Sequence, residues 1–344
     1  MSTNKPSGQV SFSTSAQPSG GRAKRVLFIV LGALVSLCVV CVVAAVLIIP
    51  PKRYPQQLLV FGEKGRAVGQ LYHPTYISLD GQGNIYVADW NDGRINEFDP
   101  HGKYLRVIDL GSGTNILGLA VAPDGTIYIS YDAVIHKLDA HGHETILSHA
   151  DAKGDLLSDI SGIALGADGS LAAADLSGDV LHFAKDGSVK VLLPRVYDLP
   201  SFSSRNELDP SMGSYDVQAG NADKNISVTV DGAGHIFALG WDNAVVIETD
   251  TQGNSLSKFG EPISFPGGWQ RGRFNFPNSI VVDGFGRIYV GDSDAIQVFN
   301  AEHKYLFSIP ISGGVDGMTM DSENNLYVIG AYPTQVIKLA ALKP

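Results

Sequence analysis

The sequence predicts an all-β fold, a six-bladed β-propeller with four-stranded antiparallel blades, preceded by a single transmembrane helix. One observation is an uncharged apolar run over residues 26–49, near the N-terminus. The second is a strand–turn–strand pattern that returns six times in the rest of the chain. The third is the abundance of glycine, 39 residues of 344, much of it in turns between short apolar segments. Repeats of about 40 residues with four short strands each are typical of propeller blades.

The apolar run reads VLFIVLGALVSLCVVCVVAAVLII and is long enough, at about 36 Å as a helix, to cross a bilayer. A cleaved signal peptide is the alternative, but its apolar region is usually shorter. Residues 1–25 form a basic tail that we expect to be disordered, and residues 50–55 a short linker to the propeller at 56–344. Basic residues flank both ends of the run, with a slight excess before it. This favours a cell-membrane anchor with the propeller on the extracytoplasmic side.

Charge is unevenly distributed along the chain. Residues 1–62 carry six basic and no acidic residues, a net charge of +6. The whole chain has a net charge of −10, so the remaining residues carry −16. Such an acidic domain repels phosphate backbones, which argues against nucleic acid as a partner. Both cysteines, Cys38 and Cys41, lie in the apolar run, so the propeller has no disulfide framework.

The six repeats share one order: an apolar strand ending near Asp-Gly, a second strand, a polar turn, a third strand, a Gly or Asn turn and a fourth strand. Their second strands begin at Ile85, Ile127, Leu171, Ile236, Ile288 and Leu326. Alternating apolar residues bounded by Gly, Asp and Asn indicate strands and hairpins. The sixth repeat stops after its third strand, so the N-terminal segment QQLLVFG, residues 56–62, is expected to supply the fourth and close the ring.

Two segments carry a resemblance to a known family: HPTYISLDGQGNIYVADWNDGRINEFDPHGKYL and RFNFPNSIVVDGFGRIYVGDSDAIQVFNAEHKYL. Their strand–Asp–turn–strand unit resembles the NHL repeat. The resemblance implies a six-bladed propeller. It leaves the activity open, because such propellers bind protein or RNA, and more distant six-bladed relatives carry out metal-dependent lactone or lyase chemistry.

Aspartates recur at two places in the repeat. Asp89, Asp175 and Asp292 follow the second strand, and we expect each to accept hydrogen bonds from the backbone N–H groups of its own turn. A second set precedes or begins the Gly-containing hairpin turns, with the same expected role: Asp80, Asp124, Asp168, Asp231 and Asp283.

A binding face is the favoured functional interpretation. Long loops at residues 194–224 and 260–275 are expected on the same face as the turns between second and third strands. Trp, Tyr and Arg concentrate binding energy at interfaces. The sequence therefore predicts a membrane-anchored module that binds a protein segment or a glycan; the alternative for each Trp is packing of its own loop. The candidate residues are Trp90, Tyr131, Trp241, Trp269, Arg271, Arg273 and Tyr332.

An enzyme is the alternative interpretation. First strands line the central channel of a propeller, and Asp159, Asn278 and Asp316 stand near their starts. Oxygen ligands of this kind hold Ca²⁺, as the resemblance to metal-dependent lactonases also implies. His73 would then be the general base. The competing interpretation of these residues is a polar, water-filled channel, and whether the protein is an enzyme stays open at this point.

Overall fold

The computed structural model describes residues 54–90, 92–147, 159–175, 178–193, 227–240, 244–263, 270–293 and 295–343. These residues belong to one compact unit, Pro55–Pro344. The expected tail, the transmembrane helix over 26–49 and most of the linker lie outside the described residues. Within the described ranges, no helix has the length and apolarity that a membrane crossing requires.

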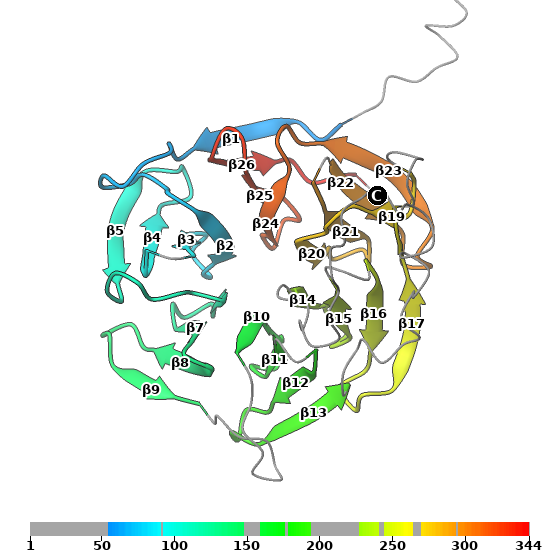
Figure 1. The fold of residues 1–344 in the computed structure, drawn as a ribbon, viewed down its shortest axis with the longest axis horizontal. Coiled ribbons are helices and arrows are strands. Elements are labelled where there is room, and N and C mark those ends of the chain that lie inside the picture. Colours follow the sequence, from blue (N-terminus) through cyan, green and yellow to red (C-terminus); the bar gives the residue numbers. More distant parts are fainter. Residues whose placement is uncertain are drawn as a thin grey trace, which may run out of the picture. The chain divides into compact units, whose positions relative to one another are not determined.

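Six four-stranded antiparallel sheets surround a central channel, as predicted (Figure 1). Blade one contains β2 (Pro74–Leu79), β3 (Ile85–Asp89), β4 (Arg94–Phe98) and β5 (Tyr104–Asp109). Blade two contains β6 (Gly118–Val121), β7 (Ile127–Tyr131), β8 (Val134–Leu138) and β9 (Glu144–Ile146). Blade three contains β10 (Ile160–Leu165), β11 (Leu171–Asp175), β12 (Val180–Phe183) and β13 (Val189–Leu193).

The second half of the ring repeats this order. Blade four contains β14 (Ser227–Val230), β15 (Ile236–Leu239), β16 (Val246–Thr249) and β17 (Ser255–Phe259). Blade five contains β20 (Ser279–Val282), β21 (Ile288–Gly291), β22 (Ala295–Phe299) and β23 (Tyr305–Pro310). Between them, β18 (Glu261–Pro262) and β19 (Arg273–Phe274) form a short parallel ladder at the base of the second long loop.

Blade six closes the ring with both ends of the propeller chain. It contains β24 (Val315–Met320), β25 (Leu326–Gly330), β26 (Gln335–Leu339) and, antiparallel to β26, the N-terminal strand β1 (Gln57–Phe61). This pairing confirms the expected closure by residues 56–62. In Figure 1, β1 in blue lies outside β26 in red.

The core consists of six apolar clusters, one between each pair of neighbouring blades. The cluster between blades six and one shows why closure matters: Leu71, Phe98 and Val336 are all fully or almost fully buried there, and Phe61 of β1 packs against them. In blade one, the second and third strands are almost entirely buried, while the outer strand β5 is largely exposed.

The turn aspartates act as expected at the hairpins. Asp80 Oδ1 accepts hydrogen bonds from the N–H groups of Gln82 and Asn84, both at 2.9 Å. Asp231 and Asp283 make the same pair of contacts in their own turns. These contacts stabilise the charged carboxylate, and the pKa of Asp124 and Asp168 in equivalent turns is lowered by hydrogen bonds from Thr126 and Ser170, respectively.

Candidate functional site

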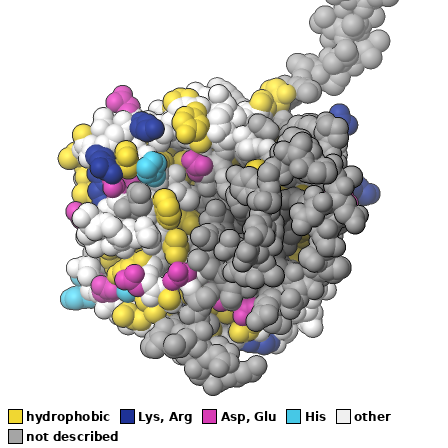
Figure 2. Space-filling view, viewed as in Figure 1, with side chains coloured by type: hydrophobic (Ala, Val, Ile, Leu, Met, Phe, Trp, Pro, Cys, Tyr) yellow, Lys and Arg dark blue, Asp and Glu magenta, His cyan; other side chains and the backbone are white. Residues whose placement is uncertain are grey.

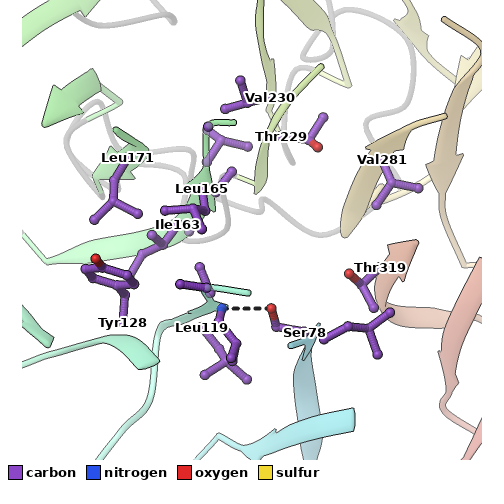
Figure 3. A pocket seen from close by; sticks show the side chains of 18 of the residues that line it. Ser78, Leu119, Tyr128, Ile163, Leu165, Leu171, Thr229, Val230, Val281 and Thr319 are labelled. Atoms are coloured by element: carbon purple, nitrogen blue, oxygen red, sulfur yellow. Dashed lines mark hydrogen bonds between the residues drawn. The ribbon is translucent and has the colours of Figure 1, made fainter. Parts of the chain in front are cut away.

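The central channel forms one continuous cavity of about 1380 Å³. First strands from all six blades line it, because these strands are innermost in their sheets. Figure 3 shows four of the side chains around this open space, Ser78, Thr229, Val281 and Thr319, each from a different blade. The cavity reaches Asn278 and Asp316 at the ends where the first strands begin; this end is called the channel mouth below.

β-Bulges shape the channel mouth. In blades one, three and six, the pairing of first and second strands slips by one residue, which leaves Thr75, Ser161 and Asp316 as extra residues. A bulge bends its strand and changes the direction of the extra side chain, and bulges are common beside active sites. The only carboxylate among these three extra residues is that of Asp316.

Asp316 lies partly buried between two polar neighbours from adjacent blades. Burial raises the pKa of its carboxyl to about 6, and the nearby His73 imidazole of blade one opposes this rise. On the other side, Asn278 Nδ2 donates a hydrogen bond to the carbonyl oxygen of Val315, at 3.2 Å. Within the described residues, no group donates a hydrogen bond to the Asp316 carboxylate. An acid of this kind, with a pKa near neutrality, can exchange protons at physiological pH.

His73 is held at the channel mouth by its backbone. Asp89 Oδ1 accepts hydrogen bonds from the N–H groups of Tyr72 and His73, at 3.0 and 3.1 Å. Asp89 Oδ2 lies 3.3 Å from Arg94 Nη2. The carbonyl oxygen of His73 accepts a hydrogen bond from the N–H group of Trp90, at 2.9 Å. The imidazole itself is exposed.

The role expected for the repeated aspartates is therefore only partly correct. Asp175 and Asp292 accept hydrogen bonds from N–H groups of their own turns, those of Asp179 and Ala295. Asp89 instead holds the segment that precedes its first strand. Burial raises the pKa of Asp89, and its hydrogen bonds and Arg94 oppose the rise.

Asp159 differs from the other two candidate ligands. It is exposed, and it does not line the channel beside Asn278 and Asp316. By strand register, Asp159 lies just before the first strand of blade three, at the position that His73 occupies in blade one. The structure thus brings Asn278, Asp316 and His73 together from adjacent blades, whereas Asp159 belongs to blade three and lies apart from them.

A divalent metal at the channel mouth does not fit the described residues. Ca²⁺ in proteins takes six to eight oxygen ligands. The described part of the mouth offers one carboxylate, one side-chain amide and an imidazole, and no group of three or more His, Cys, Asp or Glu residues in the described ranges is arranged to hold a metal ion.

The proposed binding-face residues separate into several environments. Trp90 is 44% exposed beside His73, and Tyr332 is 71% exposed. Tyr131 stacks on His136 with ring centroids 3.6 Å apart, Arg271 lies over the ring of Tyr305, and Arg273 pairs with Glu261 at 2.8 Å. Trp241 and Trp269 lie outside the described residues. Figure 2 shows one face of the propeller, on which acidic, basic and histidine side chains of the described residues lie among apolar ones.

Two residues at the channel were missed by sequence reasoning. Tyr76 reaches from blade one to blade three, where its hydroxyl donates to the carbonyl oxygen of Ser161 at 3.2 Å, and burial raises its pKa. Phe276 is 51% exposed, has a φ of 54°, and precedes a proline as His73 does. Aligning the HPT segment at His73 with the FPN segment at Phe276 would have identified Phe276. Tyr76 stands out only when the six first strands are aligned, because the other five have Gly or Ser at its position.

Comparisons with known proteins support the fold. The chain is similar in structure to XC5397 from Xanthomonas campestris, a gluconolactonase, with a TM-score of 0.58 and 15% identity over 85% of this chain and 97% of that one. A putative gluconolactonase gives a TM-score of 0.58 at 13% identity, covering 86% and 96% of the two chains. Virginiamycin B lyase from Staphylococcus aureus gives 0.55 at 12% identity, covering 84% and 99%. At such identities the similarity establishes a six-bladed propeller and no more.

Sequence comparison adds little. No family model matches the chain, so the resemblance to NHL repeats rests on the residues alone. One curated protein, the B-box type zinc finger protein ncl-1 of Caenorhabditis elegans, is 46% identical over 44 residues. That segment is 13% of this chain and 5% of that protein, so the chain spans only a small part of the relative it matches.

Proposed function

We propose that the protein hydrolyses a cyclic ester, a lactone, at the channel mouth, with the Asp316 carboxylate as general base and His73 beside it. The observation that carries the proposal is the partly buried Asp316 on a bulge, facing His73, with a pKa of about 6. A base with a pKa near the working pH is the most effective. The gluconolactonases among similar structures support the same reaction class.

The reaction needs no group beyond these side chains and water. The Asp316 carboxylate takes a proton from a water molecule as the water oxygen bonds to the lactone carbonyl carbon. The ring C–O bond then breaks, and the leaving alkoxide receives from Asp316 the proton that the carboxylate took from the water molecule. The product is an open-chain hydroxy acid, and the carboxylate is restored. Asn278 lies beside the base and would orient the substrate through its amide.

The exposed aromatic residues become the rim of this site in the proposal. Trp90 adjoins His73 through the backbone hydrogen bond between them, and its exposed side chain would form part of this rim. This replaces the expected protein- or glycan-binding role as the favoured interpretation, because Tyr131, Arg271 and Arg273 are engaged within the propeller. Attachment to the cell membrane through residues 26–49, with the propeller extracytoplasmic, stays part of the proposal.

The test is ring opening of γ-butyrolactone and glucono-δ-lactone by the full chain, followed by acid release at constant pH. General-base catalysis contributes about 10²–10⁴-fold, so Asp316→Asn should lower kcat/KM by that factor. Asp159→Asn is the matched control, because it removes an exposed carboxylate at the start of another first strand, and it should leave the rate unchanged. Equal losses of kcat/KM in Asp316→Asn and Asp159→Asn would instead favour a metal site formed by Asp159, Asn278 and Asp316. Lyase chemistry would show as an unsaturated product in place of the hydroxy acid.

A further inference from the structure

The channel wall beyond Asp316 changes character along its length. In each blade, the last residue of the first strand is aliphatic, and strand register places all six at one level: Leu79, Val121, Leu165, Val230, Val282 and Met320. All six line the cavity. This level of the channel is therefore aliphatic, and charged lining residues such as Asp231 and Asp321 follow it directly toward the far end.

The level between this ring and the mouth is also uncharged. Its six residues, one from each blade, are small: Ser78, Ala120, Ala164, Thr229, Val281 and Thr319. Figure 3 shows four of them around one open space. Nearer the mouth, the Tyr76 side chain crosses from blade one to blade three and lines the passage. The Ser78 hydroxyl is already engaged, because it accepts a hydrogen bond from the N–H group of Val121 at 2.9 Å.

The length of this passage fits a hydrocarbon chain of the substrate better than a compact head group. Within β24, Asp316 and Met320 are separated by four residue steps of ~3.3 Å, which gives a depth of about 13 Å. A lactone ring at Asp316 would therefore have an uncharged tunnel directly below it. A polyhydroxylated sugar lactone gains little there, because its hydroxyls would leave water for aliphatic walls.

We propose that the substrate is an alkyl-substituted lactone whose hydrocarbon chain extends from Asp316 down the channel to the aliphatic ring. This inference rests on the proposed lactone hydrolysis and names its substrate class. The mouth holds the ester, and the channel selects for an apolar chain over the hydroxyl groups of a sugar.

The experiment measures kcat/KM of the full chain for γ-butyrolactone, γ-hexalactone, γ-octalactone and γ-decalactone, with glucono-δ-lactone as the polar comparison. Each buried methylene is worth about 0.8 kcal/mol, so kcat/KM should rise about threefold to fourfold per methylene while the chain stays inside the channel. Glucono-δ-lactone should be no better a substrate than γ-butyrolactone.

Two variants at one position separate chain binding from catalysis. Thr319→Asp places a charge in the small-residue level, so it should flatten the chain-length dependence, measured as the ratio of kcat/KM for γ-decalactone to kcat/KM for γ-butyrolactone. Thr319→Val is close in shape and apolar, so it should keep the dependence. Thr229→Asp repeats the test from another blade, and thermal melting verifies that each variant is folded.

The possible outcomes distinguish this inference from the proposed function. Hydrolysis of glucono-δ-lactone with a flat alkyl series would overturn the alkyl-chain inference and leave lactone hydrolysis standing. If no lactone is hydrolysed, the proposed function fails, and the same series is then read by thermal shift. A melting temperature that rises with chain length in the wild type and not in Thr319→Asp would still support the channel as an alkyl site; no rise would overturn it.

Discussion

Replacing Asp316 by Asn should stabilise the protein at neutral pH and not in acid. The carboxyl has a folded-state pKa of about 6 against an ordinary value of 3.8, because burial disfavours its charged form. A group whose pKa is raised by folding contributes stability that is fully present below its unfolded pKa and is lost as pH rises through its folded pKa. Ionised Asp316 therefore weakens the fold above pH ~6, and the neutral amide of Asn does not.

The size of the effect follows from the shift. A difference of about two pKa units corresponds to about 3 kcal/mol at 1.36 kcal/mol per unit, and partial access to water reduces this to about 2 kcal/mol. For a unit spanning Pro55–Pro344, with an unfolding entropy of about 2.1 cal/mol/K per residue, that equals a rise of about 3 °C in Tm.

The assay is thermal or urea unfolding of wild type and Asp316→Asn between pH 4 and 8, with EDTA in the buffer. The gain of the variant should be absent near pH 4, grow between pH 4 and 7, and then level off. Asp159→Asn, an exposed carboxylate, is the control. A constant difference at all pH values, or a variant less stable at pH 8, would refute the assignment of Asp316 as a partly desolvated acid.

Three further predictions concern the scaffold. Asp89→Ala should cost about 1–3 kcal/mol in urea unfolding, because it leaves the N–H groups of Tyr72 and His73 without acceptors, while Arg94 keeps its ion pair with Asp92; a stability equal to that of the wild type would contradict the structure. Deleting residues 1–61 should lower Tm far more than deleting residues 1–54, because only the former removes β1 from blade six; equal melting would disprove closure by this strand. The turn carboxylates of Asp124 and Asp168 have lowered pKa values, so they stabilise the fold above pH ~4, and this stabilisation is lost as pH falls through their folded-state pKa. Asp124→Ala should therefore destabilise the protein at pH 7 and have no effect in strong acid. Acid titrations of the wild type and the variant measure this difference.

The architecture was predictable from the sequence because its signals are local and repeated. The second strands at Ile85 and Ile288 and the hairpin aspartates recur in nearly the same form, so the assignment of one blade supports the assignment of the others. Closure by residues 56–62 followed from the missing fourth strand of the last repeat.

The channel mouth was less predictable because strand register decides it. Asp159 and Asp316 look alike in the sequence, yet Asp316 is the extra residue of a bulge and Asp159 lies one step before its strand. No local sequence pattern predicts the bulge at Asp316. His73 lies near Asp316 because ring closure joins the first and last blades. The hydrogen bonds from the N–H groups of Tyr72 and His73 to Asp89 also depend on tertiary packing.

The most direct test of the central claim, that Asp316 is the general base of a lactone hydrolase, is the pH dependence of kcat/KM for γ-decalactone. Because the base works as the carboxylate, the wild-type value should rise with pH, level off above pH ~6, and fall by about 10²–10⁴-fold in Asp316→Asn. A profile with the same inflection and a similar rate in Asp316→Asn would contradict the account.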